Sequence, residues 1–370
     1  MDKIIESAVR ESIKKIAPYV PGKPIEELQR TYGLEASKII KLASNENPLG
    51  ISPMAKEAVK RYADNISRYP EGSGYYLKKK LSKNLGVSPE NIILGSGSSE
   101  IISMAMETFL NPEEEIIYPA PSFLIYKILA YKTDAKAIEV PLNDDFSYNL
   151  DRFYDKITDK TKMIILCNPN NPSGTIIYRN QLENFLEKVP DNIIIVVDEA
   201  YIEYVEDKNF GGALPFVNMK NIIVARTFSK IYGLAGLRMG YGIAKSDITG
   251  FMERIRPPFN TTGPGQEAAI AALEDGEHLK KSFETNAKGK HYLYSELEKL
   301  GVYCIPSEAN FILCRFRQDA SEIVKELEKK GIIIRYMKAP GLGKEYARIT
   351  IGTERENAIL ISNLAELCKF

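Results

Sequence analysis

The chain has 370 residues, 44% of them hydrophobic, and its 49 Lys and Arg are balanced by 49 Asp and Glu. This length and composition predict a globular protein with one large and one smaller domain. A net charge of zero lacks the basic excess that neutralises phosphate backbones, so we do not expect nucleic acid as a partner.

The N-terminal segment and the cysteines bear on location and on metal binding. Residues 1–20 mix both charge signs, and no run approaches the ~18 apolar residues of a membrane span. We therefore expect a cytoplasmic protein without a membrane partner. Its four cysteines lie far apart without C-x-x-C spacing, which predicts neither a metal site nor a disulfide framework. Both histidines, His278 and His291, lie in a charged, helix-like stretch, so we expect another group to act as the general base.

The first 44 residues are predicted to form an N-terminal arm. Ile5, Val9 and Ile13 form one stripe of a short helix, and a Pro-Gly segment follows. Such a segment is too small to hold a core of its own.

Four apolar runs in the middle of the chain end in polar clusters, at 91–100, 162–174, 192–201 and 221–230. Runs that are apolar on both faces are typical of parallel strands covered by helices. Because such sheets bind ligands at the carboxyl ends of their strands, we expect the four clusters to meet at one edge. Residues 45–260 are thus predicted to form a large α/β domain.

After Pro257-Pro258 the pattern changes to a long helical stretch over about 265–300, and strands then alternate with a helix at 319–331. This alternation predicts a smaller α+β domain over residues 261–370.

The cluster "GSGSSE" at 95–100 follows a predicted strand and precedes a helical pattern. Free N–H groups at a helix start, with the hydroxyls of Ser98 and Ser99, favour an anion site. A plain capping turn is the alternative. Glu100 replaces the last glycine of the dinucleotide fingerprint.

Two further clusters offer a carboxylate and neutral amides. Asp198 stands where a buried strand is expected to end, and "NPNNPSG" places Asn168, Asn170 and Asn171 in a turn-rich loop. Taken alone, the first is equally compatible with a loop cap and the second with a turn.

Lys230 stands eight residues before Arg238 in the glycine-rich stretch "SKIYGLAGLRMGYG". A free lysine amine, with a pKa of about 10.4, is protonated and unreactive. Bound covalently to an aldehyde cofactor, the same amine becomes an anchor and a proton carrier. Pyridoxal 5'-phosphate requires such a lysine, a carboxylate for its ring nitrogen and a phosphate cradle. The sequence predicts all three at strand ends.

Six motifs occur together and in order: "SNENPLG", "RYPEGSGYYLKKKLS", "NPNNPSG", "VVDEAYIEY", "RTFSKIYGLAGLRMGY" and "YARITIGT". On these motifs the chain resembles the fold-type I pyridoxal-phosphate aminotransferases, and among them the histidinol-phosphate aminotransferase family. The resemblance extends from the arm to the last predicted strand. It implies a large domain with a mostly parallel sheet covered by helices on both faces, a smaller α+β domain, and a homodimer.

The resemblance also assigns roles to residues. It makes Lys230 the lysine that binds the cofactor and Asp198 the partner of the ring nitrogen. Catalytic roles are implied for Lys230, Asp198 and Tyr201. The cofactor-binding residues that it implies are Ser98, Ser99, Phe123, Asn171, Asp198, Tyr201, Thr227, Ser229, Lys230 and Arg238, together with Tyr69 from the other subunit. The arm would pack on the small domain and on that subunit.

Substrate binding is assigned by the resemblance to Tyr19, Asn47, Arg335 and Arg348. A guanidinium suits both a phosphate and a carboxylate. Surface charge is the alternative for Arg335 and Arg348. The implied reaction passes an amino group between histidinol phosphate and 2-oxoglutarate, a step of histidine biosynthesis.

Two departures from the family pattern affect substrate preference more than covalent chemistry. The segment "TTGPGQ" at 261–266 is unfamiliar, and Phe123 stands where many relatives carry tyrosine. Alternative functions are an aminotransferase for aromatic or other amino acids, a phosphothreonine decarboxylase of the same fold, and a cofactor-binding regulator without catalysis. The absence of a basic patch in the sequence disfavours the last of these.

Overall fold

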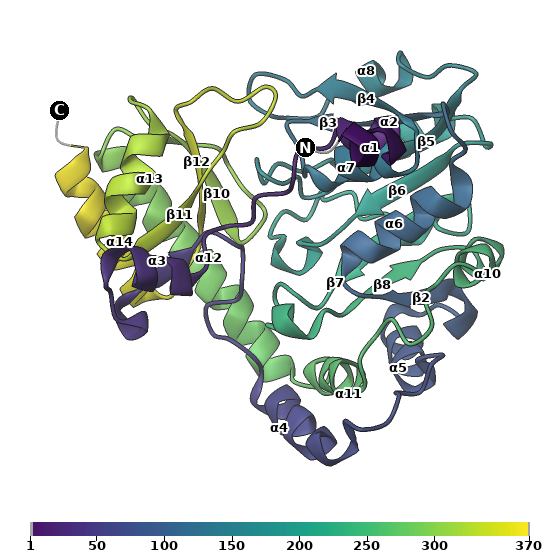
Figure 1. The fold of residues 1–370 in the computed structure, drawn as a ribbon, viewed down its shortest axis with the longest axis horizontal. Helices are drawn as coiled ribbons and strands as arrows, with labels where there is room; N and C mark the ends of the chain where they lie inside the picture. The colour runs from purple at the N-terminus through teal and green to yellow at the C-terminus, as the bar shows by residue number, and fades with distance from the viewer. Residues whose placement is uncertain (1–2, 369–370) are drawn as a thin grey trace.

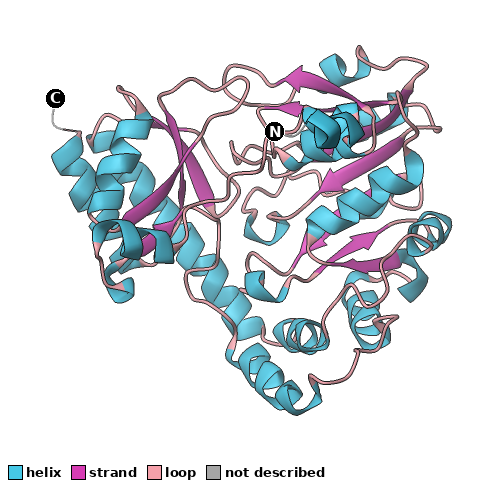
Figure 2. Cartoon of the chain, in the orientation of Figure 1, coloured by secondary structure: helices cyan, strands magenta, loops and turns pink. Residues whose placement is uncertain are grey.

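Two mixed sheets organise the chain, which is seen as a ribbon in Figure 1 and by secondary structure in Figure 2. The structure is a computed structural model and describes residues 3–368. The strands are β1 (Ile40–Leu42), β2 (Ile92–Gly95), β3 (Glu115–Ala120), β4 (Lys136–Pro141), β5 (Thr161–Cys167), β6 (Ile194–Asp198), β7 (Ile222–Thr227), β8 (Gly240–Ile243), β9 (Tyr303–Cys304), β10 (Phe311–Arg315), β11 (Ile332–Tyr336) and β12 (Tyr346–Thr350). The α-helices are α1 (Lys3–Ala8), α2 (Glu11–Lys14), α3 (Ile25–Tyr32), α4 (Pro53–Tyr62), α5 (Tyr75–Leu85), α6 (Ser98–Phe109), α7 (Ile125–Lys132), α8 (Leu150–Tyr154), α9 (Arg179–Lys188), α10 (Ser246–Glu253), α11 (Gly263–Ala272), α12 (Gly276–Lys299), α13 (Ala320–Lys329) and α14 (Glu354–Leu367). Six 3-10 turns complete the described part: η1 (Ala36–Lys38), η2 (Ala63–Asn65), η3 (Pro89–Asn91), η4 (Ile202–Tyr204), η5 (Leu214–Phe216) and η6 (Ala235–Leu237).

The larger sheet has the strand order β2-β8-β7-β6-β5-β3-β4. Its neighbouring strands pair in parallel, except that β8 is antiparallel to both β7 and β2. Two antiparallel steps restore the direction, so β2 runs the same way as β5, β6 and β7. The four apolar runs therefore end at one edge, and the prediction of a mostly parallel sheet is confirmed.

Helices cover both faces of this sheet because successive strand residues point to opposite sides. Ile164 and Ile195 pack in one core with residues of α5, α9 and α11. Their chain neighbours Ile165 and Val196 pack in the opposite core with residues of α6, α7 and α10. Both cores are buried, which explains why the strands are apolar at nearly every position.

The smaller sheet has the order β1-β11-β12-β10-β9. Helices α12, α13 and α14 cover one face, where Leu293, Leu327 and Leu360 are fully buried. Helix α3 packs against the sheet through Leu28, which contacts the separate cluster around Ile333. The predicted smaller α+β unit is confirmed.

The N-terminal arm differs from its prediction. The single helix expected from Ile5, Val9 and Ile13 is broken, since α1 ends at Ala8 and α2 begins at Glu11. Arg10 between them has non-helical backbone (φ −57°, ψ 138°), and its guanidinium donates to the carboxylate of Asp134 and to the carbonyl of Lys132. A segment this short is not a stable helix alone, so a tertiary contact decides its conformation. In Figure 1, α1 and α2 overlie α7, and α2 contacts that helix.

Two elements lie across the predicted domain boundaries. Strand β1 falls within residues 1–44 but pairs with β11 of the smaller sheet. Helix α11 follows residue 260 but packs on α4, and its Ala268 and Ala269 belong to the core of the larger sheet. The helical stretch predicted over 265–300 is divided into α11 and α12, and Asp275 caps the second helix by accepting a hydrogen bond from the backbone N–H of His278.

Within residues 3–368, no helix is long and apolar enough to cross a membrane. The same described residues contain no cluster of three or more His, Cys, Asp or Glu side chains suited to a metal ion.

Candidate functional site

A cavity of about 660 Å³ opens at the carboxyl edge of the larger sheet, facing the smaller sheet. This volume suits a small-molecule ligand. Segments distant in sequence form its wall: the arm near Tyr19, the loop after β1, the start of α6, the ends of β6 and β7, and strands β11 and β12. Thirteen of the fifteen predicted site residues line it: Tyr19, Ser98, Ser99, Phe123, Asn171, Asp198, Tyr201, Thr227, Ser229, Lys230, Arg238, Arg335 and Arg348.

Lys230 follows β7 and extends into this cavity. Its Nζ donates a hydrogen bond to the carbonyl of Ser44 at 3.3 Å and lies 5.4 Å from the centre of the Tyr201 ring. Burial, and then the nearby Arg348 and Arg238, lower the pKa of Lys230 to about 8. About a tenth of the amine is therefore neutral at pH 7, and the neutral form is the one that attacks an aldehyde.

Asp198 ends β6 and is buried. Its Oδ2 accepts a hydrogen bond from the Tyr126 hydroxyl at 2.8 Å, and its Oδ1 accepts one from the backbone N–H of Ala200 at 3.2 Å. Burial raises the pKa of Asp198 to about 6, although both hydrogen bonds and the charge of Lys230 oppose that rise. The carboxylate is thus ionised at neutral pH and is suited to a protonated ring nitrogen.

The start of α6 and the side chain of Arg238 form an anion cradle. Gly97 precedes the helix with φ 84°, and a Cβ at this position would lie 2.8 Å from Nη2 of Arg238. The guanidinium donates to the Ser229 hydroxyl at 3.3 Å and to the Ser96 carbonyl at 3.1 Å. Free N–H groups at a helix start, two serines and a cation together suit a phosphate.

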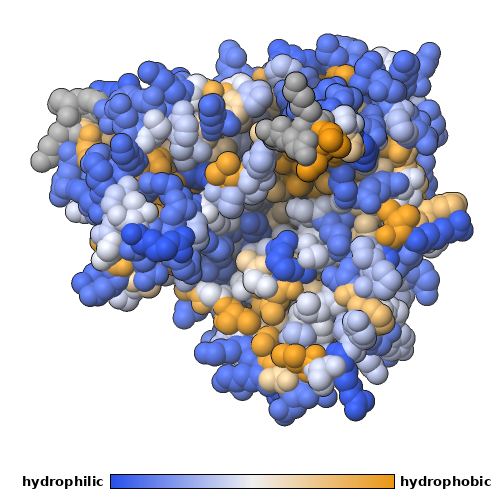
Figure 3. All heavy atoms as spheres, viewed as in Figure 1, coloured by the Kyte–Doolittle hydropathy of each residue, from blue (hydrophilic) through white to orange (hydrophobic). Residues whose placement is uncertain are grey.

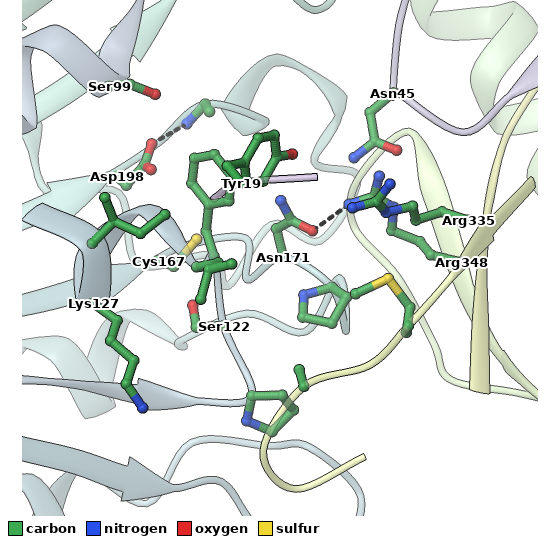
Figure 4. A pocket seen from close by; sticks show the side chains of 18 of the residues that line it. Tyr19, Asn45, Ser99, Ser122, Lys127, Cys167, Asn171, Asp198, Arg335 and Arg348 are labelled. Carbon is green, nitrogen blue, oxygen red and sulfur yellow. Dashed lines mark hydrogen bonds between the residues drawn. The ribbon is translucent and has the colours of Figure 1, made fainter. Parts of the chain in front are cut away.

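Arg348 of β12 lies on the opposite side of the cavity (Figure 4). Its Nη1 donates to Oδ1 of Asn171 at 2.6 Å, and its Nη2 donates to the carbonyl of Ala43 at 2.7 Å. Because Oδ1 of Asn171 is the acceptor, the Nδ2 group of that amide is the side free to donate elsewhere.

Arg335 and Arg348 are direct neighbours across the β11–β12 pair, so both side chains leave the same face of the sheet. Figure 4 shows the two guanidinium groups side by side, with Asp198 and Ser99 across the cavity. Arg335 donates to the carbonyl of Val20 in the arm at 2.7 Å, beside the half-exposed Tyr19. Two adjacent cations repel each other, which makes an anion the favoured occupant between them.

The two remaining predicted residues lie outside the cavity wall. Asn47 donates to the carbonyl of Ile231 at 2.6 Å and to the Ser282 hydroxyl at 2.8 Å. Both donors of its amide are therefore used to connect the Lys230 loop to α12, and the structure does not place this side chain in the cavity wall. Tyr69 is 80% exposed, its ring stacks on Phe259 at 4.4 Å, and it does not line its own chain's cavity.

Two residues of the site were missed from the sequence. Tyr126 contacts Asp198 from 72 positions away, and Asn45 lines the cavity where Asn47 was expected. A signal for Tyr126 exists, since it follows Phe123 by three residues and α7 begins between them. For Asn45 the sequence offers no signal that distinguishes it from Asn47 in "SNENPLG".

The residues present fit pyridoxal phosphate. A partly neutral amine at Lys230, a buried carboxylate at Asp198 and a cation beside a helix start at Arg238 face one cavity, and the ring of Phe123 lines its wall. Lys230 forms no ion pair with any residue in the described range 3–368, so its amine is available for covalent attachment.

Comparisons with known proteins agree with this arrangement. Residues 37–364 match the family model described as aminotransferase class I and II. The histidinol-phosphate aminotransferase of Moorella thermoacetica is 46% identical over 360 residues, which cover 97% of this chain and 92% of that protein. That of Caldicellulosiruptor saccharolyticus is 44% identical, with 97% and 99% covered. The crystal structure of the Sinorhizobium meliloti histidinol-phosphate aminotransferase in complex with pyridoxal-5'-phosphate matches with a TM-score of 0.90 and 26% identity, covering 98% of each chain.

Proposed function

The chain belongs to the class I and II aminotransferases, and we propose that it exchanges an amino group between histidinol phosphate and 2-oxoglutarate in histidine biosynthesis. The observation that carries this proposal is the placement of Lys230 and Asp198 opposite the paired Arg335 and Arg348 in one cavity. The first pair serves the cofactor, and the second serves an anionic substrate.

Pyridoxal phosphate, when bound, supplies an aldehyde that accepts the amino group and a ring that delocalises the electrons left by loss of the substrate Cα proton. Lys230 would hold the aldehyde end and, as a free amine, would move the proton at the substrate Cα. Asp198 would keep the ring nitrogen protonated, while Ser98, Ser99 and Arg238 would hold the phosphate.

Arg348 and Arg335 bind the substrate anion. Each guanidinium suits the phosphate of histidinol phosphate and a carboxylate of glutamate, so the same pair serves both half-reactions. Tyr19, next to the Arg335 contact at Val20, borders the same region of the cavity. Transfer then proceeds by a ping-pong scheme with one binding site.

Half-reactions of the holoenzyme with a panel of amino donors test this function. We expect histidinol phosphate and glutamate to convert the bound cofactor to its amino form fastest, and 2-oxoglutarate to restore it. A larger kcat/KM for aromatic amino acids would contradict the substrate assignment. Release of CO2 from phosphothreonine would indicate the decarboxylase instead.

We further propose a homodimer in which Tyr69 reaches the cofactor phosphate of the other subunit. The supporting observation is an exposed apolar surface that includes Ile66, Tyr69, Tyr75 and Tyr76. Figure 3 shows apolar residues gathered at the lower edge, around α4 and α11. Large exposed apolar patches mark interfaces. The cytoplasm is the location that we propose for such a biosynthetic enzyme.

A further inference from the structure

Asn45 is almost fully buried at the junction of the two sheets, with left-handed backbone at φ 55°. Its Nδ2 donates to the Tyr201 hydroxyl oxygen at 3.0 Å. Its Oδ1 accepts from the hydroxyl of Thr350 at 3.0 Å, and its backbone N–H donates to that same hydroxyl oxygen at 3.0 Å. Its carbonyl accepts from the Asn310 amide at 3.0 Å.

These bonds fix which end of the Asn45 amide faces Tyr201. The hydroxyl oxygen of Thr350 accepts the backbone N–H of Asn45, so its single proton is left to donate to Oδ1. With Oδ1 occupied by that donor, the Nδ2 group is the one directed at Tyr201. The tyrosine oxygen is then an acceptor on this side.

A phenol has one proton, and in this arrangement the proton of Tyr201 is not used by Asn45. Tyr201 lines the cavity, and burial raises the pKa of its hydroxyl, which therefore stays protonated. The hydroxyl is thus a donor whose remaining direction is the cavity, beside Lys230.

The family resemblance implies that the Tyr201 hydroxyl bonds the 3'-oxygen of pyridoxal phosphate. We propose that Asn45 is a positioning residue that turns the Tyr201 hydroxyl proton toward that oxygen, with Thr350 fixing the Asn45 amide. The inference rests on the proposed function for the presence of the cofactor and for the place of its 3'-oxygen beside Tyr201. The hydrogen bonds of Asn45 also connect the two sheets, because Thr350 ends β12 of the smaller sheet whereas Tyr201 follows β6 of the larger one. The Tyr201 hydroxyl is therefore correctly directed when the two sheets are in contact.

The first test is the pH midpoint of the visible absorbance of the holoenzyme, measured together with cofactor affinity. A donor to the 3'-oxygen stabilises its anionic form, so losing the donor raises the midpoint. Asn45→Gly is neutral and tolerates the left-handed backbone. We expect it to raise the midpoint by about half to one pH unit, in the same direction as Tyr201→Phe.

A double mutant separates positioning from a merely structural role. In the Tyr201→Phe background there is no hydroxyl left to direct, so Asn45→Gly should produce no further shift. Equal shifts in both backgrounds, or no shift in either, would overturn the proposal.

Thr350 supplies a second, independent test. Thr350→Ser keeps the hydroxyl and should leave the midpoint unchanged, whereas Thr350→Val removes it, frees the amide to turn, and should raise the midpoint. Identical midpoints for the two variants would overturn the role of Thr350. A wrong substrate assignment would give a different result from a wrong role for Asn45. The absorbance midpoints would still shift in the variants, but the enzyme would not turn over histidinol phosphate.

Discussion

The hydroxyl of Tyr126 donates a hydrogen bond of 2.8 Å to Oδ2 of Asp198, and both side chains are buried. A buried carboxylate that must remain ionised depends on such donors, because burial alone favours its neutral form. The phenol of Tyr126, whose own pKa is raised by burial and by Asp198, stays protonated and keeps donating.

Tyr126→Phe should weaken cofactor binding at neutral pH by about tenfold or more, since a hydrogen bond to a charged group contributes about 1.5–3 kcal/mol. The pKa of Asp198, about 6 in the cofactor-free chain, should rise further. On acidification, the variant should therefore lose cofactor affinity at a higher pH than the wild type does. Titration of the apoprotein with pyridoxal phosphate across pH 5–9 measures both effects. Tyr294→Phe, which removes a phenol bonded to the Ile305 carbonyl in the smaller unit, is the control.

Capture of the cofactor should depend on pH through Lys230. Because the pKa of Lys230 is lowered to about 8, the fraction of its amine in the reactive neutral form rises about tenfold per pH unit below that value. Above that value the fraction reaches a plateau. Stopped-flow mixing of apoprotein with pyridoxal phosphate gives the rate profile. Arg348→Gln removes a nearby cation that lowers this pKa, so its profile should move to higher pH. A wild-type plateau only above pH 10 would contradict the perturbed lysine.

Arg335 should discriminate substrates by their phosphate. Arg335→Ala should lower kcat/KM for histidinol phosphate by about tenfold to a hundredfold, because a charge-assisted contact to an anion is lost. The value for unphosphorylated histidinol should change much less. Steady-state kinetics with both substrates measure the difference, and Arg355→Ala on the exposed surface of α14 is the control. Equal losses for the two substrates would show that Arg335 acts by holding the arm at Val20 instead.

The fold followed from the sequence because strands buried on both faces leave a strong apolar signal, as in β5 and β6. Lys230 and Asp198 are singled out in the sequence only together, because each alone is equally compatible with a surface charge or a loop cap. Their joint occurrence with a serine cluster at predicted strand ends, and the six motifs, point to a cofactor site.

Asn45 and Tyr126 were missed for the opposite reason, although the spacing of Tyr126 from Phe123 offered a signal. Their importance comes from partners 156 and 72 positions away, and neither residue type is unusual where it stands. Asn45 and Asn47 share one motif, and the three-dimensional contacts decide that Asn45 faces Tyr201 while Asn47 faces Ile231. The break in the arm helix at Arg10 likewise depends on a distant carboxylate, Asp134.

The proposed dimer, with an active site shared between subunits, is testable by complementation. Lys230→Ala should retain cofactor binding and lose nearly all turnover. Tyr69→Ala should lose cofactor affinity if its ring, stacked on Phe259 at the surface, serves the other subunit as proposed. A hybrid dimer of the two variants has one site with both lesions and one site with Lys230 and Tyr69 intact. We expect differently tagged, co-expressed hybrids to recover about half of the wild-type activity per dimer. If Tyr69 served its own chain, no site in the hybrid would be intact and activity would not exceed the mean of the two parents. A hybrid of Lys230→Ala with the wild-type chain sets the level expected for one working site.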